Sequence, residues 1–464
     1  MKFYNSMSRG IEEFTPLEGK KVGLYTCGPT VYNYAHIGNF RAYIFEDILR
    51  RTLAFSGYDV TQVMNLTDVD DKTIRGAREA GLSLNDYTRT YKESFFEDLK
   101  TLRIEPAEHY PAATDHIPEM IALIERLFEK GVAYQSEDGS VYFNVATYHA
   151  YGRLAHLDVS GLRSGARVAQ DEYDKENLAD FALWKAWDED DGDVGWESPW
   201  GRGRPGWHIE CSAMSITYLG ESFDIHTGGV DNLFPHHENE IAQTEAATGK
   251  PFVSTWLHCE HLRVNGKKMS KSLGNFFTLR DLIEKGYTGR EIRYVLLSAH
   301  YRQELNFTLP ALEGVRTTLA RLDEYRTRLT DAAAGAPGDV PEWAAAGRDR
   351  FRAGVEEDLG VPQALAALFD MVHQGNRALD AGEVDGPAAA AALAVLDEMD
   401  RVLSLTPEGA AEGPGDDVTA LLAERATARS EKRFADCDRI RDQLATMGWE
   451  VRDTPDGQKV RARP

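Results

Sequence analysis

The sequence predicts an α/β protein with a Rossmann-like parallel-sheet domain that carries an insertion, followed by a helical bundle domain and a small C-terminal domain. Three observations predict this order. A strand, a helix and a second strand follow one another near the N-terminus, which is typical of a parallel sheet. Helical periodicity dominates from about residue 287, and two linkers rich in Gly, Pro and Ala interrupt that helical part.

The first of these patterns begins with a short apolar strand over residues 20–26, which a Gly-Pro turn at 28–29 ends. A helix is expected over 39–55, because apolar residues recur there on one face at i, i+4, i+8 and i+9. These residues are Phe40, Ile44, Ile48 and Leu49. A second strand over 59–66 completes a βαβ unit, so the two strands should be parallel.

The chain then alternates between helical and sheet-like segments. Helices are expected over 72–80 and 85–102, and sheet-like segments return at 223–226 and 253–264. Residues 114–200 differ, and we interpret them as an insertion within the sheet domain. This stretch combines a helix, a hairpin-like segment and an acidic loop, at 116–130, 133–144 and 188–193.

Linkers at 332–339 and 406–415 divide the C-terminal half. The segment between them is rich in Ala and Leu and reads as helical, and no internal repeat is visible. The predicted parts are a sheet domain, a connecting region, a helical bundle and a C-terminal domain, over 1–250, 251–320, 321–405 and 416–464.

The composition of the 464-residue chain, 42% hydrophobic and 27% charged, fits a globular protein with large cores. No apolar run approaches the roughly 18 residues of a membrane helix, and no signal peptide is visible, so we expect a cytoplasmic protein without a membrane partner. A net charge of -23 argues against non-specific coating of nucleic acid. The four cysteines form no Cys-x-x-Cys pair, which excludes a compact zinc finger but allows a metal site built from distant segments.

Two loops carry phosphate-binding chemistry. Lys268 and Lys271 lie three residues apart in the run KMSKS, where two point charges can reach phosphates. His36, Gly38 and Asn39 belong to the run HIGN between the first strand and the first helix, where parallel sheets bind nucleotides. Each run alone also fits a simpler interpretation, a solvated basic loop for KMSKS and a turn histidine for HIGN.

A set of metal-ligating residue types is the third feature. Cys27 ends the first strand, Cys211 lies far along the chain, and His236 and Glu240 are spaced i, i+4, so on a helix they share one face. Two thiolates, an imidazole and a carboxylate form a complete zinc ligand set. Taken singly, each cysteine also fits a buried, inert thiol, and the His236-His237 pair fits a polar helix start.

In order and placement, the two loops resemble the paired signatures of class I aminoacyl-tRNA synthetases, written HIGH and KMSKS, with Asn39 in place of the last histidine. Further segments are similar to cysteinyl-tRNA synthetases and span nearly the whole chain. The most specific are GRPGWHIECSAM at 203–214 and FPHHENE at 234–240. Others lie at 27–32, 65–72, 296–302, 305–308, 435–436, 438–442 and 453–457.

This resemblance implies a monomeric ligase that activates cysteine with ATP and Mg²⁺, releases pyrophosphate and transfers cysteine to tRNA(Cys). Residues 1–250 become the catalytic domain, 114–200 its connective insertion, 251–320 a tRNA stem-contact region and 416–464 an anticodon-binding domain.

The resemblance also assigns roles to individual residues. It implies one zinc ion on Cys27, Cys211, His236 and Glu240. It implies catalysis by His36, Asn39, Lys268 and Lys271, and ATP binding by His36, Gly38, Asn39, Asp231 and Lys271. It implies contacts with the amino-acid substrate or adenosine from Thr67, Trp207, His226 and Asp231. Cys259 and Cys437 match no family position and are expected to be inert.

A bound zinc ion would explain how such a protein selects cysteine over serine. Shape alone separates such near-isosteres by only about 10²-fold, whereas zinc favours sulfur and lowers the pKa of a bound thiol. The substrate thiolate would either join the four protein ligands as a fifth or displace Glu240, the only oxygen donor. Both routes stay open at the level of sequence.

Three alternatives are less well supported. A ligase that joins cysteine to an amino-sugar in mycothiol synthesis shares the zinc logic, but residues 415–464 resemble the anticodon-binding end of the tRNA enzyme and argue against it. A non-catalytic tRNA-binding paralogue should have lost parts of its signature loops, and both loops are present. A hydride-transferring enzyme is disfavoured because no Gly-x-Gly-x-x-Gly turn follows the first strand.

Overall fold

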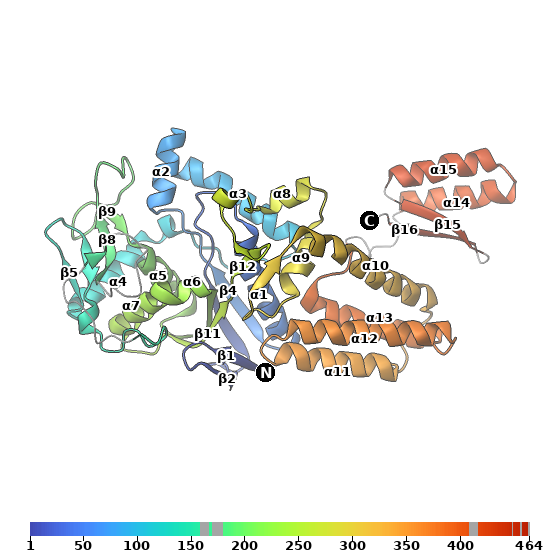
Figure 1. Cartoon of the computed structure of the whole chain (residues 1–464), viewed down its shortest axis with the longest axis horizontal. Helices are drawn as coiled ribbons and strands as arrows, with labels where there is room; N and C mark the ends of the chain where they lie inside the picture. The colour runs from blue at the N-terminus through green and yellow to red at the C-terminus, as the bar shows by residue number, and fades with distance from the viewer. Residues whose placement is uncertain (158–166, 169–179, 408–415, 448, 455–456, 463–464) are drawn as a thin grey trace. The chain divides into compact units, whose positions relative to one another are not determined.

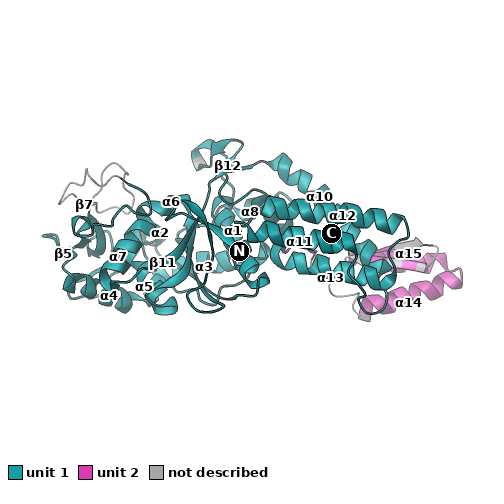
Figure 2. Cartoon of the chain, turned by 90° about the horizontal axis from the view of Figure 1, so that it is seen from below, with its two compact units in different colours: residues 1–403 teal, residues 404–464 magenta. Residues whose placement is uncertain are grey.

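The computed structural model (Figure 1) describes residues 1–157, 167–168, 180–407, 416–447, 449–454 and 457–462. The chain divides into two compact units, Met1–Leu403 and Ser404–Pro464 (Figure 2).

A parallel sheet lies at the centre of the first unit. Its strands are β3 (Lys21–Thr26), β4 (Asp59–Met64), β10 (Phe223–Gly229) and β11 (Val253–Cys259), in the order β11-β10-β3-β4. All neighbouring pairs are parallel. Helix α1 (Ile37–Phe55) connects β3 to β4, which confirms the predicted βαβ unit.

Apolar packing fixes α1 against this sheet. Phe45, Leu49 and Leu53 of the helix belong to one buried cluster with residues of three strands. The strand residues are Val22, Leu24, Ile225 and Leu257. Burying each such side chain stabilises the fold by roughly 1.5–3 kcal/mol. The start of α1, where HIGN lies, is therefore held at the carboxyl end of β3.

The sheet changes its direction of winding at β3. From β3 the chain passes to β4 on one side and later returns to β10 on the other side. In open α/β sheets, ligands bind at the carboxyl ends of the strands at such a switch point. The ends of β3 and β10 are therefore the expected location of a ligand site.

The predicted insertion forms a small sheet of its own next to helix α4 (Ile117–Glu129). The strands β5 (Ala133–Gln135) and β6 (Val141–Phe143) are antiparallel, which confirms the hairpin-like segment. The strands β7 (Arg167–Val168) and β8 (Asp180–Ala186) complete it, and β9 (Gly203–Pro205), just beyond the predicted end at residue 200, pairs with β8. Residues 158–166 and 169–179 of this insertion lie outside the described part.

The acidic loop at 188–193 is tied to the insertion. Asp191 is buried and accepts a hydrogen bond from Nε of Arg204 at 2.7 Å. Arg204 also contacts Asp71 at the start of α2 (Asp71–Ala80). At least this aspartate of the loop therefore pairs within the protein.

One predicted segment of the sheet domain is divided in the structure, and one hairpin was not predicted. The segment 253–264 is sheet-like as expected, but it is divided into two strands, because the backbone N–H of Glu260 bonds to the carbonyl of Tyr301 and the chain leaves the main sheet after β11. Strand β12 (Leu262–Val264) pairs instead with β13 (Lys267–Lys268) and β14 (Leu305–Phe307). A hairpin of β1 (Lys2–Asn5) and β2 (Gly10–Glu13) was not predicted.

Helices account for most of the rest of the first unit. Helices α2 and α3 (Leu84–Thr101) confirm the expected segments. Further along the chain come α5 (Trp207–Leu219), α7 (Glu238–Thr248), α8 (Leu279–Glu284), α9 (Gly289–Leu297), α10 (Leu309–Ala332), α11 (Glu342–Glu356), α12 (Val361–Asp380) and α13 (Gly386–Leu403). Figure 1 shows α11, α12 and α13 side by side, which confirms the helical bundle. Among the described helices, none is long and apolar enough to cross a membrane.

The second unit contains two helices and a hairpin. These are α14 (Asp416–Ser430), α15 (Phe434–Thr446), β15 (Trp449–Thr454) and β16 (Gly457–Ala462). Val418, Ile440, Leu444 and Val451 form its small core. Residues 408–415 of the second predicted linker lie outside the described part of the chain.

Candidate active site and metal centre

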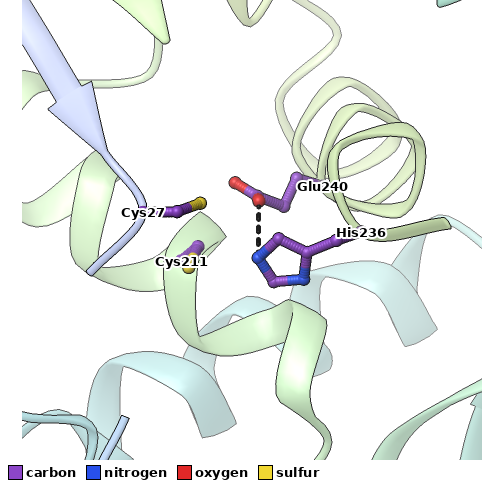
Figure 3. A group of neighbouring side chains, drawn as sticks. All are labelled: Cys27, Cys211, His236 and Glu240. Carbon is purple, nitrogen blue, oxygen red and sulfur yellow. Dashed lines mark ion pairs between the residues drawn. The ribbon is translucent and has the colours of Figure 1, made fainter. Parts of the chain in front are cut away.

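Four potential metal ligands meet at the switch point of the sheet. The thiols of Cys27 and Cys211, the imidazole of His236 and the carboxylate of Glu240 lie within 4.8 Å of one another (Figure 3). They come from the end of β3, from α5, from the irregular turn η4 (Leu233–His237) and from α7. The structure thus brings together all four residues that the resemblance implied.

The chemistry of these donors fits a bound cation. Nε2 of His236 lies 3.0 Å from Oε1 of Glu240, yet that buried oxygen has no hydrogen-bond partner. Burial raises the pKa of Glu240 to about 7 and raises the pKa of the Cys211 thiol well above its usual value. A divalent cation would reverse both shifts, because it favours carboxylate and thiolate. The residues therefore fit zinc, which takes sulfur, nitrogen and oxygen ligands.

A second set of donors shares two members with the first. Cys27, His226, His237 and Glu240 also lie within 4.8 Å of one another. Sγ of Cys27 is 3.3 Å from Nε2 of His237, and Nε2 of His226 is 3.0 Å from Oε2 of Glu240. His226, which the resemblance assigned to substrate contacts, therefore lies directly beside the metal ligands.

His237 was missed because the i, i+4 spacing selects only His236. The backbone around this pair is not a regular helix, since Phe234 is extended (φ -143°, ψ 133°) between two helical turns. Helical spacing alone therefore does not say which ring faces Cys27. Two neighbouring histidines after a proline were the only signal in the sequence.

Further buried histidines surround the two sets. Nδ1 of His208 lies 2.9 Å from Nδ1 of His236, and Nδ1 of His237 lies 2.9 Å from Nε2 of His258. Burial lowers the pKa of His208, His226 and His258 to about 3, so these rings are neutral. Such ring-to-ring hydrogen bonds orient the nitrogens that face a metal. His208 and His258 were not predicted as site residues.

The HIGN run begins helix α1 with a reciprocal cap. The backbone N–H of Asn39 donates to Nδ1 of His36 at 3.1 Å, and the N–H of His36 donates to Oδ1 of Asn39 at 3.1 Å. Burial lowers the pKa of His36, so the ring is neutral. Because Nδ1 accepts, the proton of the neutral ring lies on Nε2. His36 and the amide of Asn39 therefore each keep an N–H group that can bind a phosphate oxygen.

The second signature loop lies against the first. The N–H of Ile37 donates to the carbonyl of Phe277 at 3.0 Å. A Cβ at Gly38 would lie 3.3 Å from Cε of Met269 in KMSKS, so glycine keeps this contact open. Lys268 is exposed at the end of β13. Lys271 begins a short turn (Lys271–Leu273), and its side chain lies outside the described part.

The other residues that were predicted to contact the substrates lie at different distances from the candidate metal ligands. The ring of Trp207 stacks on His236, with centroids 4.1 Å apart. Thr67 is buried, and its hydroxyl donates to Glu210 at 3.0 Å. Asp231 follows β10 with 83% of its side chain exposed, and lies 3.6 Å from His261. Cys259 and Cys437 are buried and belong to neither donor set.

Comparison with known proteins agrees with this fold. A family model described as the class I (C) tRNA synthetase catalytic domain matches residues 13–317. The chain is therefore built as a class I tRNA synthetase. Models described as a DALR domain and a cysteinyl-tRNA ligase anticodon binding domain match residues 350–406 and 412–461.

Close relatives narrow the class to one family. The cysteine–tRNA ligase of Protochlamydia amoebophila is 50% identical over 466 residues, which cover 99% of this chain and 98% of that protein. The cysteine–tRNA ligase of Brachyspira hyodysenteriae is 52% identical over 468 residues, 98% of each chain. The chain belongs to the cysteine–tRNA ligase family.

Solved structures share the fold at low identity. A methionyl-tRNA synthetase of Mycobacterium tuberculosis in complex with methionyl-adenylate aligns with a TM-score of 0.61 and 17% identity, covering 83% of this chain and 90% of that one. A putative arginyl-tRNA synthetase of Campylobacter jejuni aligns with a TM-score of 0.57 and 14% identity, covering 84% and 93%. These likenesses concern the fold alone.

Proposed function

We propose that this chain activates cysteine with ATP, releases pyrophosphate and transfers the cysteinyl group to tRNA(Cys). The observation that carries the proposal is the juxtaposition of two signature loops and a thiol-rich donor set at one switch point. Cys27 lies nine residues before His36, so selection of the side chain and activation of the carboxylate would occur side by side. Family membership supports the same reaction.

Activation is an attack of the cysteine carboxylate on the α-phosphate of ATP. Such reactions depend mainly on positioning and on stabilisation of charge. In our proposal Nε2–H of His36 and the amide of Asn39 donate to phosphate oxygens, beside Gly38. Lys268 and Lys271 then cover the pyrophosphate, and Mg²⁺ accompanies ATP.

Selection of cysteine is assigned to the first donor set, of which all members except the half-buried Cys27 are buried. Cys27, Cys211, His236 and Glu240 would hold a zinc ion, which supplies a Lewis acid that prefers a thiolate to a hydroxyl. Trp207 would form a wall of the side-chain pocket, since its ring stacks on His236. His226 would orient Glu240 through its 3.0 Å contact.

Two further residues are proposed to contact the substrates. Asp231 would bind either the ribose hydroxyls or the substrate ammonium, because its exposed carboxylate lies at the carboxyl end of β10. Thr67 lies just beyond the end of β4 and donates to Glu210, so it would act from the wall of the pocket.

Recognition of tRNA is assigned to two segments, one in each unit. In our proposal residues 416–464 bind the anticodon and residues 251–320 contact the tRNA stem. The match of 412–461 to an anticodon-binding model supports the first assignment. We further propose that the chain acts as a monomer in the cytoplasm, where tRNA is charged.

Cysteine-dependent exchange of pyrophosphate into ATP tests activation. The purified chain should catalyse exchange with cysteine at a rate more than about 10²-fold above that with serine, the limit expected for shape alone. Charging of tRNA(Cys) should then be measured beside ligation to an amino-sugar acceptor. Equal exchange with both amino acids, or ligation to the amino-sugar only, would contradict the proposal.

A further inference from the structure

Four tyrosines form a partly exposed group beside the HIGN run. Tyr32 and Tyr34 lie in the segment between β3 and α1, and each is 39% exposed. The ring of Tyr34 packs edge-on against Tyr91 with centroids 5.4 Å apart, and Tyr91 packs against Tyr87 at 5.2 Å. We call these four residues the tyrosine surface. Exposed aromatic rings gathered in this way often mark an interaction site.

Specific contacts hold the tyrosine surface in place. The hydroxyl of Tyr87 on α3 donates to the backbone carbonyl of Tyr32 at 2.8 Å. A Cβ at Gly76 on α2 would lie only 2.3 Å from that hydroxyl, so glycine is needed for Tyr87 to approach. Two helices therefore position the exposed loop that leads to His36.

Cations lie over two of the rings. Nζ of Lys72 on α2 is 5.6 Å from the centroid of Tyr32, and the guanidinium of Arg280 on α8 is 5.2 Å from that of Tyr34. Acidic neighbours partly balance the second cation, since Arg280 also lies 2.9 Å from Glu97. The tyrosine surface therefore combines ring faces with positive charge.

The same surface continues into the candidate active site. Helix α8 begins one residue after Thr278, whose backbone pairs with that of His36. The loop carrying Tyr32 and Tyr34 ends at His36 itself. A ligand that lies on the tyrosine surface would therefore lie close to His36 and the first signature loop.

We propose that the tyrosine surface binds the unpaired 3′ end of the tRNA, an inference that rests on the proposed function. An unpaired end offers bases that stack on aromatic rings and on Arg, and phosphates that attract cations. Its terminal ribose must reach the activated cysteine at the ends of β3 and β10. The nucleotides just before it must then pass close to the loop that precedes His36.

Binding of intact and shortened tRNA tests this proposal. We would measure the Kd of the full chain for tRNA(Cys) and for the same tRNA without its unpaired 3′ nucleotides, at one fixed salt concentration. Tyr32→Leu should weaken binding of the intact tRNA by about 10-fold, the cost of one lost stacking contact. Binding of the shortened tRNA should not change.

Two further variants separate the rings from general effects of charge and folding. Lys72→Ala should likewise weaken only the intact tRNA. Lys21→Ala, which removes an exposed cation at the amino end of β3, should affect neither tRNA. Melting temperatures close to that of the unmodified chain would exclude misfolding of Tyr32→Leu.

Pyrophosphate exchange distinguishes failure of this inference from failure of the proposed function. Exchange needs no tRNA, so it should be unchanged in both Tyr32→Leu and Lys72→Ala. If these variants bind both tRNAs as the unmodified chain does, or lose affinity for both equally, the tyrosine surface does not hold the 3′ end. If the unmodified chain shows no exchange, the proposed function itself fails.

Discussion

At the scale of single residues, the donors around Glu240 are held in a state that is costly without a cation. Burial raises the pKa of the Glu240 carboxyl and of the Cys211 thiol, so both favour their neutral forms. Burial also lowers the pKa of His236 to about 3, which leaves the ring in the neutral form that binds metal. One divalent ion would satisfy all three groups.

Two neighbouring histidines distinguish the two overlapping donor sets. If zinc binds Cys27, Cys211, His236 and Glu240, we expect His236→Ala to lower the zinc content well below one ion per chain. His237→Ala should keep zinc, because that ring then lies outside the ligand set. Metal analysis of the purified variants measures this directly, with Cys259→Ala as the control for loss of a buried cysteine elsewhere. Zinc loss in His237→Ala alone would favour the second set.

A substitution of Lys271 tests ATP activation separately from metal binding. We expect Lys271→Ala to lower cysteine-dependent pyrophosphate exchange by more than about 10-fold, because a positive charge on the leaving pyrophosphate is lost. The zinc content should be unchanged, since the lysine belongs to neither donor set. Unaltered exchange in this variant would refute its proposed role.

Glu46 predicts a pH dependence of stability. This carboxyl is buried in α1 and accepts one hydrogen bond from Thr227, and burial raises its pKa from 4.5 to about 8. The folded state therefore holds a proton that the unfolded chain releases above pH 4.5. Stability should fall as the pH rises from about 4.5 to about 8, by at most about 1.4 kcal/mol per pH unit.

Glu46→Gln should remove this cost while keeping the acceptor for Thr227. We expect the urea midpoint of the variant to exceed that of the unmodified chain, by a margin that grows between pH 6 and pH 8. Urea unfolding at three pH values provides the measurement. A margin that does not change with pH would show that Glu46 does not carry the raised pKa.

At the scale of elements, the turn after β3 depends on the absence of a side chain. The N–H of Gly28 donates to Oδ1 of Asn65 at 2.9 Å, and a Cβ at Gly28 would lie 1.7 Å from the backbone oxygen of Asn65. This turn carries the chain from Cys27 toward the start of α1. Close backbone contact between the ends of β3 and β4 therefore helps to set the position of the first thiol.

Gly28→Ala should consequently be strongly destabilising. We expect a loss of more than about 2 kcal/mol in the free energy of unfolding, because a backbone carbonyl cannot move away as a flexible side chain can. Gly314→Ala is the matched control, since nothing lies within 4 Å of a Cβ at that position in α10. That change should stabilise the chain by roughly 0.5–1 kcal/mol. Denaturant unfolding of both variants compares them, and equal effects would contradict the steric argument.

At the scale of the whole molecule, chemistry and anticodon binding are assigned to different units. The donor sets, HIGN and KMSKS all belong to Met1–Leu403, whereas the anticodon-binding match covers 412–461. Each unit has its own buried apolar cluster. Activation of cysteine should therefore not require the second unit.

A chain that ends at Leu403 tests this division. We expect it to keep cysteine-dependent pyrophosphate exchange but to charge tRNA(Cys) with a kcat/KM lower on the order of 10²-fold, because the anticodon contact, one of several linked contacts with the tRNA, is lost. Both activities are measured on the same preparation, with its zinc content as a check on folding. Normal charging by the shortened chain would remove the proposed role of the second unit.

Much of this organisation follows from local patterns in the sequence. Apolar spacing predicted α1, and the strand-helix-strand order predicted the parallel β3–β4 pair, because periodicity and short connections act over a few residues. Residue types suggested a zinc ligand set, and the family resemblance assigned it to Cys27, Cys211, His236 and Glu240, whose ligand atoms do lie together. That they bind zinc remains a prediction.

Only the tertiary structure decided how distant segments face one another. The ring of His237 reaches Cys27 because the backbone at Phe234 departs from helical geometry, which residue spacing does not reveal. Strand β12 leaves the main sheet because Glu260 pairs with Tyr301, about forty residues along the chain. The tyrosine surface likewise depends on the packing of α2, α3 and α8 around one loop. The sequence by itself determined which chemical groups this protein carries, whereas long-range packing decided which of them meet.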